Sequence, residues 1–388
     1  MKVLFLTHAL PRPADGAIDS RELRLAVSLR GEGIEVVIVA PGGGGRGREE
    51  IDGVAIERFH VPQREPALAG GGNGGEGRGD WRTSEPRFRT LRFLGAEFTG
   101  AVRARREFEP DLVHAHWWFP GGLVGTWVSA LGNLPLVTSL HRADLRSAQA
   151  GAFARPLFRH VVRNSAVVTA DAHGLARKAR SVMPSVDVVI APMPATTDIF
   201  LPGGVRAPDR LVTVAPFDAT GSAEQVLRAV AAMRTRVSLD VVGEEEGGGR
   251  LTELARTLGL ADRVQWLGHP DDRRLAAVFQ RATALVLPTM NDWLPLTAVH
   301  AMLCRAPVVA FDFGGITDVI QHDRTGILVP PSDTTALSGA LDALFARSDR
   351  GASLGEAARM YALASFAPES VARRFAGIYR QALAAAPA

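Results

Sequence analysis

Short apolar runs alternate along the first half of the chain with segments in which apolar residues recur at helical spacing. The runs have the length and β-branched content typical of buried strands. They cover residues 2–6, 35–41, 112–116, 136–140 and 167–170. Between the first two runs, Leu23, Leu25, Ala26 and Leu29 line one face of a predicted helix, which Gly31 and Gly33 end. Strands that alternate with helices predict an α/β fold with a parallel sheet covered on both faces.

The second half repeats this pattern. Its predicted strands cover residues 211–215, 239–243, 264–268, 284–288 and 307–311. Pro192 and Pro194 favour an extended connection between the two series. We therefore predict two Rossmann-like domains, residues 1–190 and 191–368, and a last helix within 369–388 that can cross back to the first domain. A chain of 388 residues is long enough for two domains of typical size.

The composition is that of a folded, water-soluble chain, with 46% hydrophobic and 22% charged residues. The single cysteine, Cys304, excludes an intrachain disulfide and a cysteine-based metal site. The first apolar run is too short for a signal peptide, and no stretch reaches the roughly 18 apolar residues that span a bilayer. We expect a cytoplasmic protein, with peripheral attachment to a membrane as the alternative.

Peripheral attachment to a membrane would depend on a basic segment, residues 87–106, in which arginines flank apolar residues at helical spacing. This pattern predicts an amphipathic helix. One interpretation is a surface helix packed on the first sheet, and the other is contact with an anionic membrane or a phospholipid-type acceptor. We expect no nucleic-acid partner, because the basic residues lack interleaved aromatic residues on a known binding module.

Two histidines, His114 and His116, lie on the same side of one predicted strand. Together they could form half of a zinc site. Because the sequence names no third ligand that would converge on them, histidines of the core or of a cleft are the favoured interpretation. We therefore expect no metal.

Several longer motifs point to a known family. Residues 111–122 resemble the first-domain signature of the family 4 retaining glycosyltransferases, as does the loop at Gly16 before its helix. Residues 307–310, 314–316 and 326–333 match the second domain of that family more closely. The resemblance covers nearly the whole chain. It implies a GT-B fold, in which two Rossmann-like domains face each other across a cleft.

The resemblance also implies an activity. Such an enzyme moves a hexosyl group from a nucleotide sugar to an acceptor and retains the configuration of the sugar. It needs neither a metal nor a bound cofactor. The second domain would hold the nucleotide sugar and the first domain the acceptor, whose identity stays open and includes glycans and lipid-linked molecules.

Two catalytic residues follow from the resemblance. His141 begins a His-Arg-Ala-Asp segment that stands where the family has a histidine facing the donor sugar. It follows the predicted strand 136–140, and ligands bind beyond the carboxyl ends of strands in open α/β sheets. Asp292 stands in place of the first of two glutamates separated by seven residues, and keeps its charge.

Further residues are expected to bind the donor. His300 replaces the second glutamate, which holds the ribose in the family. Pro295 can begin a helix, so that the backbone N–H groups of Leu296 and Thr297 face a phosphate. Gly16 belongs to the donor-binding loop of the first domain.

The expected diphosphate clamp is altered. The family has an arginine and a lysine where this chain has Pro216 and Gly221, and neither residue carries charge. Arg142 stands where the family has glycine and could supply the missing charge. The departures at Pro216, Gly221 and His300 favour the alternative function, a non-catalytic glycosyltransferase-like subunit that binds or regulates a partner enzyme.

Overall fold

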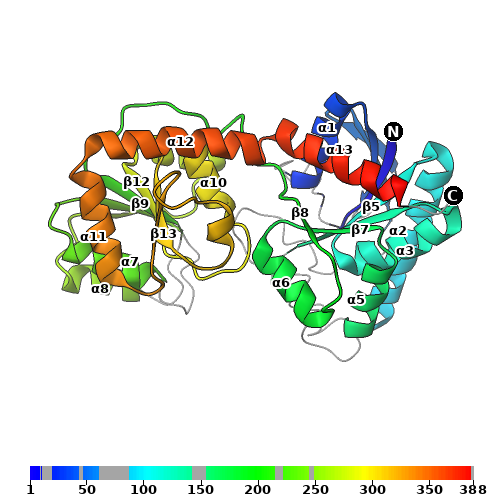
Figure 1. Cartoon of the computed structure of the whole chain (residues 1–388), viewed down its shortest axis with the longest axis horizontal. Helices are drawn as coiled ribbons and strands as arrows, with labels where there is room; N and C mark the ends of the chain where they lie inside the picture. The colour runs from blue at the N-terminus through cyan, green and yellow to red at the C-terminus, as the bar shows by residue number, and fades with distance from the viewer. Residues whose placement is uncertain are drawn as a thin grey trace. The chain divides into compact units, whose positions relative to one another are not determined.

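A computed structural model of the chain describes residues 1–8, 10, 20–42, 47–60, 87–141, 154–214, 222–243 and 249–385. The chain divides into two compact units (Figure 1). The first combines Met1–Pro194 with Pro368–Ala388, and the second is Ala195–Ala367.

The first unit contains a sheet whose strands, among the described residues, follow the order β3-β4-β2-β1-β5-β6-β7-β8. Their bounds are β1 (Lys2–Leu6), β2 (Glu35–Pro41), β3 (Gly47–Ile51), β4 (Val54–Phe59), β5 (Leu112–His116), β6 (Leu136–Leu140), β7 (Val167–Ala170) and β8 (Val189–Ile190). Neighbouring strands are parallel, except that β3 pairs with β4 in the antiparallel direction. The predicted parallel α/β sheet is therefore confirmed.

Helices cover both faces of this sheet. They are α1 (Arg21–Leu29), α2 (Arg87–Phe108), α3 (Leu123–Gly132), α5 (Ala154–Arg163), α6 (His173–Val182) and α13 (Pro368–Ala384), with the short helical turns η2 (Arg30–Glu32) and η3 (Trp118–Gly122). One core lies between the sheet and α2, α3, α5 and α6. The other lies between the opposite face and α1 and α13, which run beside each other in Figure 1. The last helix of the chain therefore completes the first unit.

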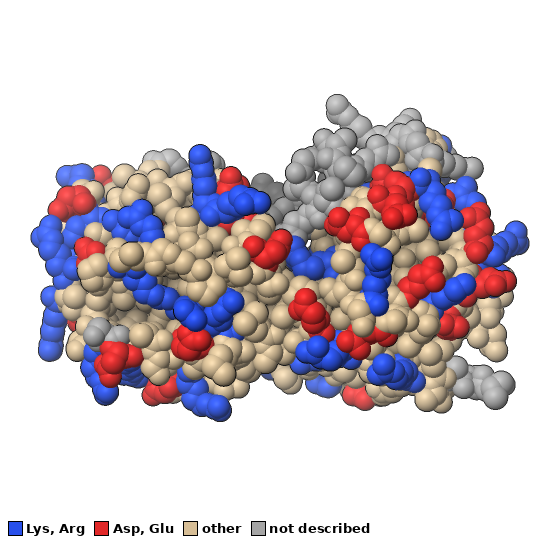
Figure 2. Space-filling view, turned by 90° about the horizontal axis from the view of Figure 1, so that it is seen from above, with Lys and Arg blue, Asp and Glu red and all other residues tan. Residues whose placement is uncertain are grey.

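Helix α2 contains the basic segment and packs on the first sheet through one side. Phe93, Leu94, Ala101, Ala104 and Phe108 are buried in the core. Burial of this side agrees with the interpretation as a packed surface helix. Basic and acidic side chains are interspersed on the face seen in Figure 2. Among the described residues, no helix is long and apolar enough to cross a membrane.

The second unit contains a parallel sheet whose described strands follow the order β11-β10-β9-β12-β13-β14. The strands are β9 (Arg210–Val214), β10 (Ser238–Val242), β11 (Val264–Trp266), β12 (Ala284–Leu287), β13 (Val308–Phe311) and β14 (Ile327–Val329). The helices are α7 (Ser222–Ala232), α8 (Arg250–Thr257), α9 (Asp272–Arg281), α10 (Leu296–Leu303), α11 (Thr334–Phe345) and α12 (Ser348–Phe366), with the turn η4 (Gly314–Asp318). The second Rossmann-like domain is thus also confirmed.

Candidate functional site

The carboxyl ends of β1, β5 and β6 meet at one edge of the first sheet. β5 lies between the other two strands, and all three are parallel. His8 lies just beyond β1, His116 ends β5, and His141 directly follows β6. His141, which was predicted from the family resemblance and from its place directly after the strand 136–140, does lie at this edge, where ligands of open α/β sheets bind.

The three histidines and Glu22 are buried and form a group with half-buried Trp117, which we call the sheet-edge cluster. The rings of His116 and His141 are stacked with their centroids 5.7 Å apart. The Trp117 ring lies 5.0 Å from the rings of both His8 and His141. Trp117 has a φ of 75°, which is uncommon for a residue with a side chain. This backbone conformation occurs in the turn that places the indole beside the rings of His8 and His141.

Glu22 brings a carboxylate to the cluster from the first turn of α1. The Ser20 hydroxyl, which caps the helix, donates a hydrogen bond of 2.6 Å to this carboxylate. One ligand atom each from Glu22, His116 and His141 lies within 4.8 Å of the other two. The sequence contained a signal for this residue, because position 22 continues the buried stripe of positions 25, 26 and 29 at helical spacing.

Burial controls the charges of the cluster. Removal from water lowers the pKa of His8 and that of His116 to about 4, and holds the pKa of His141 well below its ordinary value. Burial alone would raise the pKa of Glu22, but His116, Arg21 and the Ser20 hydroxyl together place it below the ordinary value. At neutral pH the cluster therefore combines a carboxylate with neutral imidazoles.

Several polar atoms of the cluster have no hydrogen-bond partner among the described residues. They are both ring nitrogens of His116, Nδ1 of His8 and the indole nitrogen of Trp117. Buried polar groups are nearly always hydrogen-bonded in folded proteins, so such atoms call for an explanation. A ligand at the sheet edge would provide partners for them.

His114 has a different environment, although it lies on the same side of β5. Its Nδ1 is 2.8 Å from the Tyr379 hydroxyl of α13, and its Nε2 is 2.8 Å from the Ser139 hydroxyl of β6. Ser139 continues the chain of hydrogen bonds to Thr169 of β7, at 2.7 Å. His114 is thus a core histidine that joins the last helix to the sheet.

A pair of glycines positions the segment that carries Asp292 in the second unit. The Gly315 N–H donates a 2.9 Å hydrogen bond to the carbonyl oxygen of Asn291. A Cβ atom on Gly314 would overlap the same carbonyl, and one on Gly315 would overlap the carbonyl of Trp293. Gly314 also has a φ of 69°. Only glycine fits this close approach without rearrangement, so the turn sets the path of the backbone at half-buried Asp292.

Helix α10 follows this segment. It begins at Leu296 with Pro295 as its N-cap, and no side chain caps it. The N–H groups of Leu296 and Thr297 lie in the first turn, where the helix itself offers no acceptor. His300 lies one turn later and is buried, with its ring stacked on Phe200 at 3.9 Å and an interplanar angle of 8°. Its contact with a ribose stays a prediction.

The remaining site positions fall outside the described residues. These are Gly16, Arg142, Pro216 and Gly221. The expected donor loop of the first unit and the altered diphosphate clamp therefore stay predictions.

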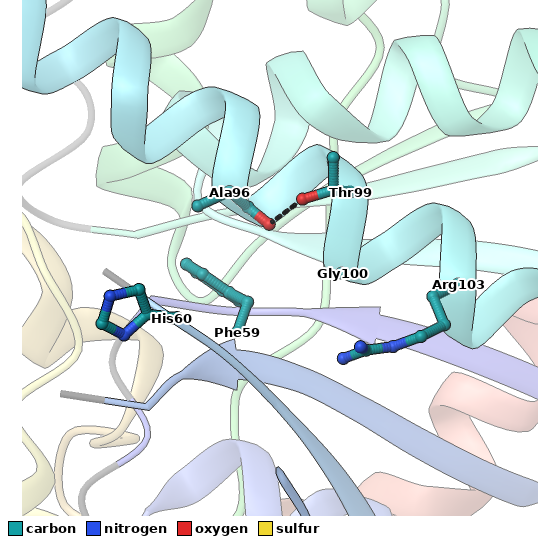
Figure 3. Close-up of a pocket in the computed structure, with 6 residues that line it drawn as sticks. All are labelled: Phe59, His60, Ala96, Thr99, Gly100 and Arg103. Atoms are coloured by element: carbon teal, nitrogen blue, oxygen red, sulfur yellow. Dashed lines mark hydrogen bonds between the residues drawn. The ribbon is translucent and has the colours of Figure 1, made fainter. Parts of the chain in front are cut away.

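A separate small hollow lies between the end of β4 and α2 (Figure 3). Its lining consists of Phe59, His60, Ala96, Thr99, Gly100 and Arg103. Its two polar side chains from α2 are already engaged, since Arg103 pairs with Glu57 and the Thr99 hydroxyl donates to the Ala96 carbonyl at 3.0 Å. The sheet-edge cluster is therefore the stronger candidate in the first unit.

Comparison with known proteins identifies the family. A model of the glycosyl transferase 4-like domain matches residues 16–194, and a model of glycosyl transferases group 1 matches residues 207–361. The D-inositol 3-phosphate glycosyltransferase 2 of Catenulispora acidiphila is 30% identical over 306 residues, 66% of this chain and 69% of that protein. The chain belongs to the glycosyltransferases.

A second relative supports the same family. The D-inositol 3-phosphate glycosyltransferase of Gordonia bronchialis is 28% identical over 306 residues, 69% of this chain and 66% of that protein. The chain thus spans about two thirds of the length of these relatives. The glycosyltransferase family is a family of enzymes, so membership does not favour the non-catalytic alternative.

Solved structures confirm the GT-B fold of this glycosyltransferase. Sucrose-phosphate synthase from Thermosynechococcus elongatus has a TM-score of 0.73 at 20% identity, with 99% of both chains covered. Anabaena HepE, solved in complex with UDP, has a TM-score of 0.71 at 16% identity, with 98% of this chain and 100% of that chain covered. At these identities the likeness concerns the fold.

Proposed function

We propose that the protein transfers a hexosyl group from a nucleotide sugar to an acceptor and retains the configuration of the sugar. One observation carries the proposal beyond family membership. The Gly314–Gly315 turn holds the segment with Asp292 directly before the start of α10, where N–H groups without intrahelical acceptors can receive a phosphate. This short stretch of chain therefore contains both a carboxylate that can bind sugar hydroxyls and N–H donors that can bind a diphosphate.

Each predicted residue has a role in this reaction. His141 and Asp292 contact the donor sugar, and His300 holds the ribose. The N–H groups of Leu296 and Thr297 bind the diphosphate. Charge develops on this leaving group during transfer and must be stabilised by donors that are already in place.

The charge missing at Pro216 and Gly221 would come from Arg142. A guanidinium is always charged and presents a planar fork to phosphate oxygens. In this scheme no protein-bound metal takes part in the departure of the diphosphate. The reaction would take place in the cytoplasm, where nucleotide sugars are the co-substrates.

The relatives suggest which molecules to test first. HepE has been solved with UDP-glucose, so uridine diphosphate sugars are the first donors to examine. Two relatives are named for D-inositol 3-phosphate, so a phosphorylated cyclic polyol is the first acceptor class.

A lipid-linked acceptor is the second class, because α2 and α3 expose apolar side chains next to arginines. Leu91 is 66% exposed and Leu131 is 59% exposed. Trp127 is partly exposed and contacts Phe98 with ring centroids 5.9 Å apart. Apolar and indole side chains beside a basic helix are typical of surfaces that contact anionic membranes.

A thermal-shift screen with UDP, GDP and their sugars tests the donor. A ligand at a hundred times its dissociation constant should stabilise the protein by about 2.7 kcal/mol. Arg142→Ala and Asp292→Asn should abolish or strongly weaken the shift. The matched controls, Arg236→Ala and Asp262→Asn, alter an exposed ion pair of the second unit and should leave it unchanged.

Transfer is then measured by mass spectrometry of the acceptor, and the anomeric configuration of the product by NMR. A product of inverted configuration would refute retention alone. If no nucleotide sugar shifts the wild type and no acceptor gains a sugar, the transferase proposal is wrong.

A further inference from the structure

The outer side of α5 and α6 has a charge imbalance that sugar transfer does not use. In residues 112–141 and 154–186, the described part of this stretch, Asp171 is the one acidic residue, and it is buried. The same part of the chain has six cationic side chains, all on the two helices: Arg155, Arg159, Arg163, Arg177, Lys178 and Arg180. Because the whole chain has a net charge of only +3, positive charge is concentrated on these helices.

Helical spacing arranges the cations in two rows. Helix α5 has an arginine at every fourth residue, and α6 has two arginines three residues apart, so each helix has a row of cations along one side. The Arg159 guanidinium donates hydrogen bonds of 3.3 and 3.2 Å to the carbonyl of Val182, the last residue of α6, so the rows belong to neighbouring helices. Arg163, Arg177 and Arg180 are exposed and form no ion pair with a described residue.

Helix α3 packs against α5 and continues this surface with uncharged side chains. It contains no charged residue, and Trp127 and Leu131, which lie one turn apart, are 39% and 59% exposed. Leu157 of α5 is also exposed. All three helices cover the same face of the first sheet (Figure 1). The outer side of α3, α5 and α6, which we call the basic face, therefore combines cations with exposed leucine and indole side chains.

We propose that the basic face docks the protein on an anionic lipid bilayer. Each basic side chain near such a surface strengthens binding by about fivefold, through attraction to the anionic headgroups. Guanidinium groups are weakly hydrated and present a planar fork to phosphate oxygens. Leucine and indole side chains enter the boundary between headgroups and acyl chains, where apolar burial adds to the attraction.

Other anionic partners fit this face less well. Surfaces that bind single-stranded nucleic acid stack bases on aromatic rings between the cations. The one phenylalanine of α5, Phe158, is buried, and α6 has no Phe, Tyr or Trp. An acidic polypeptide would account for the cations but not for the exposed leucine and indole side chains beside them.

The proposal goes beyond the lipid-linked acceptor considered above, because docking requires neither a donor nor an acceptor. It also differs from a contact through α2. On that helix Arg103 pairs with Glu57, and exposed Arg106 is followed by exposed Glu107, so acidic groups weaken the attraction to an anionic surface. The outer sides of α5 and α6 have no such acidic groups among the described residues.

The experiment measures co-sedimentation of the full-length protein with phosphatidylcholine vesicles that contain or lack phosphatidylglycerol, at low and high NaCl. The wild type should bind only the anionic vesicles at low salt. Replacement of Arg163, Arg177 and Arg180 together by glutamine should weaken this binding by about a hundredfold, about fivefold per cation.

A matched control removes the same charge elsewhere. Replacement of Arg273, Arg274 and Arg324 by glutamine alters three exposed arginines of the second unit and should leave vesicle binding unchanged. Arg106→Gln on α2 should weaken binding less than Arg177→Gln on α6. Leu131→Ser tests the apolar part, and should weaken binding to anionic vesicles at both salt concentrations, because salt does not screen apolar burial.

Circular dichroism checks that each variant is folded. If the triple variant of the basic face does not fold, Arg163→Gln, Arg177→Gln and Arg180→Gln are measured singly, each with an expected loss of about fivefold. The proposal is overturned if the wild type binds both kinds of vesicle equally or binds neither. It is also overturned if the variants of the basic face bind as tightly as the control, or if polyglutamate binds as tightly as the vesicles and Leu131→Ser has no effect.

Discussion

Replacement of Glu97 by glutamine should stabilise the protein by an amount that grows as the pH rises. Glu97 lies on α2 with an exposed fraction of 0%, and neither carboxyl oxygen has a hydrogen-bond partner among the described residues. A Cβ atom at Gly121 would lie 3.7 Å from one of these oxygens, so the carboxyl group lies under the turn that follows β5. This burial raises the pKa of Glu97 from 4.5 to about 8.

The sign of the effect follows from the proton balance. Between pH 4.5 and about 8 the folded protein keeps a proton that the unfolded chain releases. The free energy of unfolding therefore falls as the pH rises through this window, by about 1.4 kcal/mol per pH unit. The loss across the whole window is about 4–5 kcal/mol. Glutamine has no proton to release, so this part of the pH dependence disappears in Glu97→Gln.

Urea unfolding followed by tryptophan fluorescence, at pH 5.5, 6.5 and 7.5, measures the effect. The free energy of unfolding of the variant minus that of the wild type should rise by about 1.4 kcal/mol per pH unit. Other titrating groups, including the histidines of the sheet-edge cluster, are present in both proteins and cancel in this difference. Glu107→Gln, an exposed position on the same helix, should show no such trend. A difference for Glu97→Gln that stays constant with pH would refute the reasoning.

Three further predictions concern packing, the hydrogen-bond chain and the surface. Gly315→Ala should lower the free energy of unfolding by about 1–3 kcal/mol, because the new methyl group overlaps the Trp293 carbonyl; unchanged urea unfolding would contradict this. Tyr379→Phe should cost about 1–3 kcal/mol in the same assay, since it leaves Nδ1 of buried His114 without a partner; a neutral effect would show that this bond contributes nothing. Binding to vesicles should rise with anionic lipid and fall with salt if the segment 87–106 contacts a membrane, whereas salt-independent sedimentation would exclude that contact.

The fold could be predicted from the sequence because most strands of both sheets are buried on both faces. Such strands have nearly continuous apolar runs, as residues 112–116 and 136–140 show. The strand Gly47–Ile51 was not predicted. It pairs at the edge of the first sheet, and most of its residues are exposed and polar, so no apolar run marks it.

The site was harder to predict. His141 was proposed because its segment resembles that of the family and because it directly follows a strand that the sequence locates. Glu22 was missed, although it falls on the buried stripe of its helix, because an acidic residue near a helix start is normally explained by the helix dipole. Its proximity to His116 depends on how α1 packs against the sheet, and no local pattern contains that information.

The two histidines of β5 show why residue type and alternation are insufficient to assign a role. Alternation correctly places His114 and His116 on one side of the strand, with ring centroids 4.2 Å apart. The two rings then have different surroundings, because different elements pack against them. Tyr379 and Ser139 complete the hydrogen bonding of His114, while His116 lies within 4.8 Å of the Glu22 carboxylate and stacks on the ring of His141. Because the last helix supplies a hydrogen-bond partner to His114 while the first helix brings only a nearby carboxylate to His116, the difference between a core histidine and a candidate site histidine arises only when the unit is assembled.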